Sequence, residues 1–364
     1  MSDELLVLAR GTMTPGPGGP ALRLSTDLVW MTRDGAGAVR ESRRSPGVPV
    51  DVAGDAGGDA AVADVRGLLA ATAVALREAP VQSVLAEVRW LPGHEWRRPR
   101  VLARIETALG PTCTGFAAPG GASGNGRAHV MASAPDVPPY ASRPGPPPEG
   151  WRELPLLMRP AVAAIPAAGT ALMLTSRAVR GRPDRLDGRR VLGALALTDL
   201  PSTHPEAAPD DAGHPADEIP MVEAGVLRTL RIERASGAPR GRAVWNHDRQ
   251  SLHPSPQPRL RLSAPLAPSP GPVVELQWPV ESLRRYDPDG FLSLICVARV
   301  SDHPERSFAV RLRARPQTIM RAVRGAAGEP VLVVCADADV TTPPLLLPSA
   351  RELAGKGRCA VETL

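Results

Sequence analysis

Apolar residues in the first 110 positions alternate in some segments and follow helical spacing in others. In residues 21–33, leucines and a tryptophan fall on alternate positions, which is typical of a strand with one buried face. Residues 60–79 instead carry apolar side chains on one helical face, and Pro80 ends that pattern. Pro99 suits the first position of a second helix, and Gly110 suits its end. The pattern predicts strands over residues 4–10, 21–33 and 81–90 and helices over about residues 60–79 and 99–109.

The composition changes after these elements. Residues 111–150 are rich in Pro, Gly, Ser and Ala, and we interpret them as a partly extended connection between an N-terminal α+β domain, residues 1–110, and a C-terminal domain, residues 151–364. The second domain begins with a strand and an Ala-rich helix, which we expect to be interrupted near Pro166. Short strands with turn-rich connections follow and predict a curved antiparallel sheet or open barrel, so the fold class is α+β. We place strands at about residues 154–158, 191–198, 219–223, 226–233, 259–263, 272–278, 291–300, 307–314 and 330–334.

Composition narrows the classes of function. Aromatic residues make up 3% of the chain, and its 42 prolines and 34 glycines favour turns and short strands over long helices. The net charge of +5 would permit a polyanionic partner. The arginines, however, are scattered among acids and lack the neighbouring aromatics on which bases stack, so we expect no nucleic-acid partner. No apolar run approaches the roughly 18 residues of a membrane span. We therefore predict a soluble, cytoplasmic protein without a membrane partner.

The sequence contains no complete catalytic or metal-binding motif. The four cysteines lack Cys-x-x-Cys spacing and helical histidine partners, which favours buried thiols. Residues 121–126 lack the Lys-Ser/Thr of a phosphate-binding loop, so a flexible loop or Asn-Gly turn is the better interpretation. Several histidines lie near aspartates and could assemble a metal site, although loop histidines beside acids are more often solvated. These metal candidates are His204, His214, His247, His253 and, near the C-terminus, Cys359.

The middle of the C-terminal domain carries short motifs in a recognisable order. An acidic Asp-Asp-Ala-Gly turn at residues 210–213 leads to a strand, a Glu-Ala-Gly-Val-Leu turn at residues 223–227 and a Pro-Gln-Pro-Arg loop at residues 256–259. Upstream, residues 192–201 look like a strand that leads into the acidic turn. This order resembles the C-terminal domain of the TldD/PmbA family, which comprises zinc peptidases once called modulators of DNA gyrase and their metal-free partner subunits.

The resemblance, clearest over residues 154–262, implies a zinc site that this chain lacks. Active family members carry His-Glu-x-x-x-His on the Ala-rich helix, and a late cysteine completes the site. The equivalent helix must lie within residues 167–177, which contain no His, Glu or Asp. PmbA-type (TldE) subunits also lack the motif and pair with a TldD-type subunit, whose zinc faces a shared cavity for extended peptides. The resemblance therefore implies a non-catalytic subunit with a TldD-type partner, a peptide substrate and zinc only in the partner.

Two other functions remain open. One is a stand-alone scaffold that binds peptides or proteins and has lost catalysis, and the other is an active metallopeptidase whose metal site has moved to the histidines named above. If the protein handles peptides, arginines near the hairpin could face peptide carboxylates, although a solvated arginine face is the simpler interpretation. These arginines are Arg231, Arg234, Arg240, Arg242 and Arg249.

Overall fold

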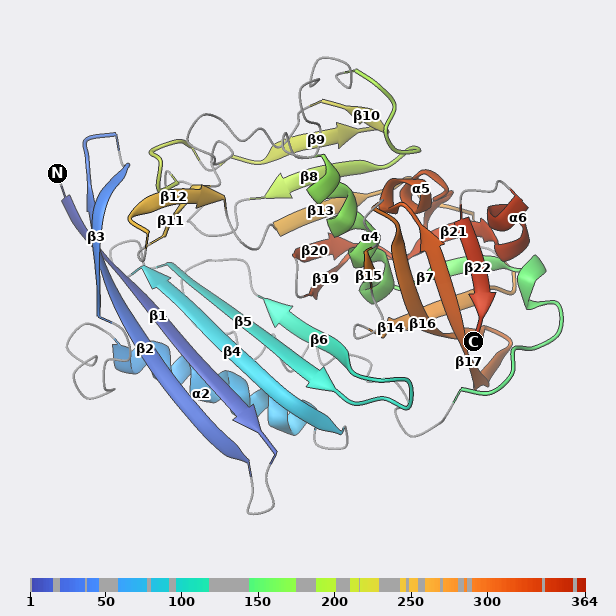
Figure 1. Ribbon diagram of the computed structural model, residues 1–364, viewed down its shortest axis with the longest axis horizontal. Coiled ribbons are helices and arrows are strands. Elements are labelled where there is room, and N and C mark those ends of the chain that lie inside the picture. Colours follow the sequence, from blue (N-terminus) through green and yellow to red (C-terminus); the bar gives the residue numbers. More distant parts are fainter. Residues whose placement is uncertain are drawn as a thin grey trace.

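The computed structural model shows an α+β protein that is mostly sheet, with a few helices and with sheets that are open rather than closed (Figure 1). The N-terminal sheet, in blue and cyan, meets C-terminal sheets that run from green to red (Figure 1). The structure describes residues 2–15, 20–36, 38–45, 58–76, 80–91, 96–117, 144–174, 188–200, 210–215, 217–228, 243–246, 249–254, 259–268, 271–280, 285–286, 290–335, 338–355 and 359–364. No helix within these residues is long and apolar enough to cross a membrane.

The N-terminal sheet has six strands in the order β3-β2-β1-β4-β5-β6, each antiparallel to its neighbours. Helix α2 (Gly58–Ala75) packs across one face, where its Val65 and Leu69 share a core with Val7 and Val84 of the sheet. The strands predicted from alternation and the helix predicted from helical spacing thus form two layers around one core. The strands are β1 (Ser2–Thr14), β2 (Ala21–Arg33), β3 (Val39–Ser45), β4 (Val81–Leu91), β5 (Trp96–Ile105) and β6 (Thr112–Ala117).

Strand β5 corrects our prediction of a helix over about residues 99–109. Val101, Ala103 and Ile105 are buried on alternate positions, as a strand requires. The apolar spacing of this segment suits a helix and a strand equally, and pairing with β4 on one side and β6 on the other decides for the strand. Within the described residues, β6 pairs with β5 only from Arg100 onward, so no described ladder partner faces Pro99 on that side.

Two further sheets and a small hairpin make up the C-terminal part. One sheet has the order β10-β9-β8-β13-β20-β19, and the other has the order β18-β21-β7-β14-β16-β17-β22, with β15 paired to β16. Strands β13 and β20 are parallel, as are β7 and β14, whereas the remaining named pairs are antiparallel. The strands predicted over residues 219–223 and 259–263 are confirmed as β9 and β13.

The bounds of these strands place them between residues 155 and 363. The first sheet contains β8 (Ala196–Leu200), β9 (Ile219–Glu223), β10 (Val226–Leu227), β13 (Arg259–Ser263), β19 (Val331–Val334) and β20 (Asp339–Thr342). The second contains β7 (Pro155–Met158), β14 (Val274–Pro279), β15 (Arg285–Tyr286), β16 (Leu292–Val300), β17 (His303–Ala314), β18 (Gly325–Ala326), β21 (Leu345–Ser349) and β22 (Cys359–Thr363). The hairpin consists of β11 (Ala243–Asn246) and β12 (Ser251–Pro254), and the short helices are η3 (Trp151–Glu153), α5 (Pro316–Arg321) and α6 (Ala350–Gly355).

Helix α4 (Pro160–Met173) is the central element of the C-terminal part and contacts strands of both sheets (Figure 1). Its residues 162–171 are all buried, most of them in one core with side chains from the two sheets. We predicted an interruption near Pro166, but the helix continues through it. Proline removes one backbone donor and crowds the preceding turn. Packing on all sides of α4 outweighs that local cost, because tertiary burial supplies most of the stability of helices in proteins.

Strand β6 extends the N-terminal sheet beyond residue 110, into the segment that we interpreted as a connection. A Cβ atom at Gly115 would lie 2.4 Å from the carbonyl oxygen of Val101 and 3.0 Å from the Cβ of Val334 on β19. Glycine therefore allows β6 to fit between β5 and β19, which it contacts. The loop or turn that we predicted at residues 121–126 lies outside the described residues.

Candidate functional site

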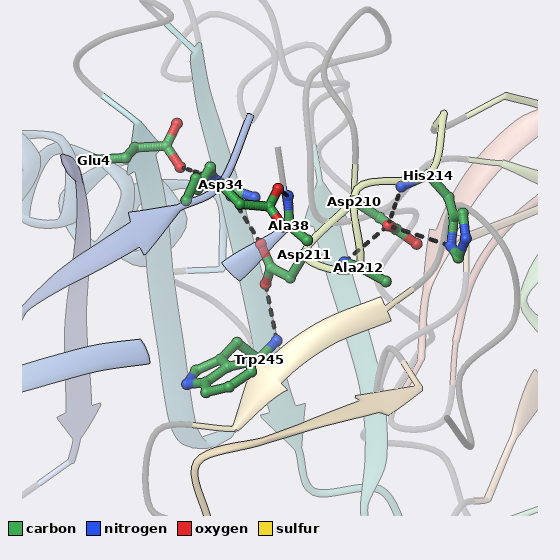
Figure 2. Close-up of polar contacts among 9 residues, drawn as sticks. Glu4, Asp34, Ala38, Asp210, Asp211, Ala212, His214 and Trp245 are labelled. Carbon is green, nitrogen blue, oxygen red and sulfur yellow. Dashed lines mark hydrogen bonds and ion pairs between the residues drawn. The ribbon is translucent and has the colours of Figure 1, made fainter. Parts of the chain in front are cut away.

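The acidic turn that precedes β9 is closed by its own side chain. Asp210 is buried, and its Oδ1 accepts hydrogen bonds from the backbone N–H groups of Ala212 at 3.0 Å and His214 at 2.9 Å (Figure 2). The Asp210 N–H in turn donates to the His214 carbonyl at 2.8 Å. Gly213 has φ +79°, in the left-handed region that glycine favours. The Asp side chain that bonds to nearby backbone and the glycine with positive φ, both expected from the sequence, are therefore present. Their role is to hold the shape of the turn.

The next residue of this turn, Asp211, joins it to the N-terminal sheet. Its Oδ1 accepts a hydrogen bond from Arg33 Nη2 at 2.8 Å. Its Oδ2 accepts one from the backbone N–H of Trp245 at 2.8 Å (Figure 2). Arg33 also binds Glu4 Oε2 through Nε at 2.7 Å. Burial alone would lower the pKa of Arg33, but attraction to Asp211 and Glu4 more than offsets it and raises that pKa. One carboxylate thus links the ends of β2 and β11.

A second buried carboxylate, Asp339 at the start of β20, binds the same face of the N-terminal sheet. Arg98 Nη2 lies 2.5 Å from Asp339 Oδ2, and Arg100 Nε lies 3.3 Å from Oδ1. Arg100 Nη2 also donates to the carbonyl oxygen of Cys335 at 3.0 Å. Asp211 and Asp339 therefore fix the N-terminal sheet to the C-terminal part at two points. In this arrangement both carboxylates act as hydrogen-bond acceptors for arginines, which is a docking role.

The candidate histidines do not form a metal site within the described residues. His214 is partly buried, with its Nδ1 4.0 Å from Asp210 Oδ1, which already accepts two backbone hydrogen bonds. His204, His247 and the side chain of His253 lie outside the residues that the structure describes. In the described ranges, no three His, Cys, Asp or Glu side chains gather closely enough to hold a metal ion. A metal role for the remaining histidines stays a prediction.

The cysteine near the C-terminus is buried in strand β22. Cys359 lies opposite Ala314 of β17, and burial raises the pKa of its thiol to about 11. Burial likewise raises the pKa of Cys296 on β16. A protonated thiol is a poor nucleophile and must lose its proton before it can bind zinc. Both cysteines therefore behave as small apolar core residues at neutral pH.

The arginines that we considered for peptide binding are not brought together in the described part of the chain. Arg249 is exposed in the turn between β11 and β12. The other four, Arg231, Arg234, Arg240 and Arg242, lie outside the described residues. A role for these arginines in binding peptide carboxylates stays a prediction.

Helix α4 does not fit a zinc ion. Its sequence, PAVAAIPAAGTALM, contains no carboxylate, imidazole or thiol. Its one hydroxyl belongs to Thr170 and donates to the carbonyl oxygen of Pro166 at 2.7 Å. Zinc in proteins takes nitrogen, sulfur or carboxylate ligands, so α4 offers it none. The helix instead fills the space between two sheets with alanine.

Comparison of folds identifies the architecture, although the sequence matches no protein-family model and no curated protein. The structure superposes on TldE from Thermococcus kodakarensis with a TM-score of 0.59 at 11% sequence identity, over 95% of each chain. The chain has the TldE fold.

Two bacterial proteins described as modulators of DNA gyrase share this TldE fold. The protein from Thermotoga maritima gives a TM-score of 0.55 at 12% identity, over 95% of this chain and 94% of that one. The protein from Bacteroides thetaiotaomicron gives 0.51 at 9% identity, over 95% and 93%. The fold predicted from the short motifs is confirmed, and the TldE fold extends over the N-terminal sheet, where the sequence shows no motif.

Two of the arginines that bind the C-terminal part, Arg98 and Arg100, are absent from our sequence-based candidates. We assigned residues 99–109 to a helix, and the alternation of strand β5 was therefore missed. In β5, Arg98 and Arg100 alternate with the core residues Val101, Ala103 and Ile105 and lie on the opposite face, and Arg89 of β4 lies directly opposite Arg98. An alternating Arg-x-Arg pattern within a predicted strand would have placed these side chains on one face. The partner Asp339 had no local signal, since nothing in its segment indicates contact with residues more than 200 positions away.

Proposed function

We propose that this protein is a non-catalytic, TldE-like subunit that pairs with a zinc-bearing TldD-type peptidase acting on peptides. Helix α4 carries this proposal. It keeps the position between two sheets that the fold requires, yet it is made of residues that bind no metal and abstract no proton. The zinc and the general base would come from the partner, and this chain would supply part of the wall around the peptide.

The packing of α4 explains why restoring a zinc site would need more than one substitution. Two zinc-binding imidazoles on adjacent turns need open space beside the helix for the metal and a water molecule. Residues 162–171 are all buried, so a metal ion and its water at these positions would have to be accommodated within the core. Alanines dominate the segment, so larger side chains would have to displace the strands that pack against it. The helix serves as a core element, and its lack of metal chemistry is built into the surrounding packing.

The experiment that tests the proposal mixes the purified chain with a TldD-type protein that carries His-Glu-x-x-x-His. We expect a stable complex by size-exclusion chromatography with light scattering, and peptide cleavage that needs both chains. Replacing the partner's zinc histidines with alanine is the matched control and should abolish cleavage without dissolving the complex.

Two results would contradict the proposal, and each points to a different function. Cleavage by this chain alone, with about one zinc per chain and loss of activity in His253→Ala, would indicate a relocated metal site. Peptide binding by the isolated chain without any complex with a TldD-type protein would instead indicate a stand-alone scaffold.

A further inference from the structure

Strand β3 is the last strand on one side of the N-terminal sheet, so its outer edge faces away from β2. Among the strands that the structure describes, none pairs with this edge. Ser42 lies opposite Met31 of β2, and its backbone N–H and C=O point to the outer side, where a side chain binds both. An open strand edge is a template for pairing with another chain.

The side chain of Gln250, in the turn of the β11–β12 hairpin, takes the place of a neighbouring strand at Ser42. Its Oε1 accepts a hydrogen bond from the Ser42 N–H at 3.3 Å, and its Nε2 donates to the Ser42 carbonyl oxygen at 3.1 Å. Two opposed residues of an antiparallel ladder exchange the same pair of bonds. The side-chain amide therefore closes the edge in the way that a peptide group of an added strand would.

The backbone of Gln250 indicates that its side chain is what this position requires. Gln250 has φ +47°, in the left-handed region that glycine adopts far more readily than glutamine. Trp245 holds the same hairpin against β3, because its Nε1 donates to Ser42 Oγ at 2.8 Å. Farther along the edge, the N–H of Val39 donates to the carbonyl oxygen of Asp211 at 2.9 Å. Contacts from distant segments thus cover the edge of β3 at two points.

We propose that the outer edge of β3 is a pairing surface for a second copy of this chain, and that Gln250 keeps it closed. The strand is complementary to itself about Ser42. In an antiparallel pair centred on this residue, the two Ser42 residues would exchange the backbone hydrogen bonds that each now makes with Gln250. Such a pair has twofold symmetry, so every contact occurs twice and the assembly closes as a dimer.

The charges along β3 favour the same register. Glu41 and Arg43 are both exposed, and pairing about Ser42 would place Glu41 of each copy opposite Arg43 of the other. Opposite charges at directly opposed positions stabilise a strand pair, and like charges destabilise it. The arginines nearer the ends of the strand repel less, because Arg40 is bound to Asp34 at 2.8 Å. A second copy therefore fits this edge in charge as well as in backbone.

The test compares the full chain with its Gln250→Gly variant by sedimentation velocity over a range of protein concentrations. Glycine suits the positive φ of the turn, so this change removes the side-chain amide and preserves the hairpin. We expect the unaltered chain to remain a monomer and the variant to form a dimer, with a dissociation constant at least about tenfold lower than that of the unaltered chain. Gln250→Asn also tolerates this φ and has a shorter side chain, so it should shift the dissociation constant in the same direction.

A matched control removes a different exposed glutamine. Gln82 lies on β4, inside the sheet, and its Nε2 donates to Glu106 rather than to the backbone of an edge strand. Gln82→Ala should therefore leave the chain a monomer at every concentration.

A charge exchange tests the register of the dimer. In the Gln250→Gly background, Arg43→Glu would place Glu41 opposite a second glutamate and should weaken the dimer at least about tenfold. Adding Glu41→Arg restores opposite charges and should return the dissociation constant to within about threefold of the Gln250→Gly value. Association caused only by a damaged fold would not be rescued by this second substitution.

Several results would overturn the proposal. These are a monomeric Gln250→Gly variant, self-association of the unaltered chain equal to that of the variant, a dimer insensitive to Arg43→Glu, or failure of Glu41→Arg to restore it. Association beyond the dimer would also reject the twofold pairing. All measurements use the isolated chain, so their outcome is independent of complex formation with a TldD-type partner.

Discussion

Replacing Asp211 with alanine tests whether the acidic turn holds the N-terminal sheet to the C-terminal part. Asp211 is 1% exposed and accepts one hydrogen bond from Arg33 and one from the backbone N–H of Trp245. A hydrogen bond to a charged group contributes about 1.5–3 kcal/mol, and a neutral one about 1 kcal/mol. Arg33 keeps Glu4 as a partner, so the loss stays near the lower end of the roughly 3–5 kcal/mol that a broken buried ion pair costs. We expect Asp211→Ala to lower the free energy of unfolding by about 3 kcal/mol.

Urea unfolding followed by circular dichroism measures this loss, and amide hydrogen exchange locates it. Protection should fall first in β2, β3 and β11, since the backbone of Asp211 also accepts a hydrogen bond from Val39 at 2.9 Å. Glu329→Ala removes an exposed carboxylate and should change stability by less than about 0.5 kcal/mol. Asp211→Asn keeps the shape of the side chain without its charge. Its loss of unfolding free energy should lie between the losses of Asp211→Ala and Glu329→Ala. If Asp211→Ala were as stable as Glu329→Ala, the docking role of the turn would be refuted.

Three further predictions concern a turn, a thiol and a glycine. The backbone N–H of Ala38 and other donors lower the pKa of Asp34. An NMR titration of Asp34 should therefore give a midpoint below the ordinary value of about 3.9. The contribution of Asp34 to stability should be lost only as the pH falls through that lower midpoint. Burial raises the pKa of Cys359 to about 11, so iodoacetamide should label it at pH 7.5 only after unfolding, and stability should fall between about pH 9 and 11 as the unfolded thiol ionises first. Gly225 has φ +82° and a Cβ there would lie 1.7 Å from a carbonyl oxygen, so Gly225→Ala should cost more than about 3 kcal/mol. The control Gly35→Ala, whose Cβ meets nothing within 4 Å, should cost less than about 0.5 kcal/mol in the same urea titration.

The sequence predicts those elements whose pattern has one structural solution. Strand β2 begins and ends where the alternation of residues 21–33 indicates. Helix α2 runs over Gly58–Ala75, close to the predicted range, because its apolar face has helical spacing over several turns. The prediction for strand β5 was wrong because its apolar spacing fits both the helical and the strand period. Only pairing with the neighbouring strands of the sheet determines which one forms. Strands β20, β21 and β22 were not predicted, although β21 and β22 are as long as the predicted strands β9 and β13.

The contacts of the candidate site are likewise of two kinds. Local contacts can be predicted from the sequence, and contacts between distant segments cannot. The turn at Asp210 and Gly213 is predictable, because its hydrogen bonds are made within five residues. The ion pairs that dock the two parts are not, since Arg33 and Asp211 lie 178 positions apart. Nothing in a single sequence couples positions so far apart, whereas the folded sheet brings them to 2.8 Å.

One physical constraint makes the TldE fold compatible with a helix α4 that carries no metal ligands. A helix that contacts two sheets must keep its length and its depth, or both sheets lose their common core. It does not need to keep any particular side chain, provided that the volume remains filled. Alanine satisfies this condition because it has high helix propensity and allows the sheets to approach closely. The shape of the helix can therefore persist without a zinc site.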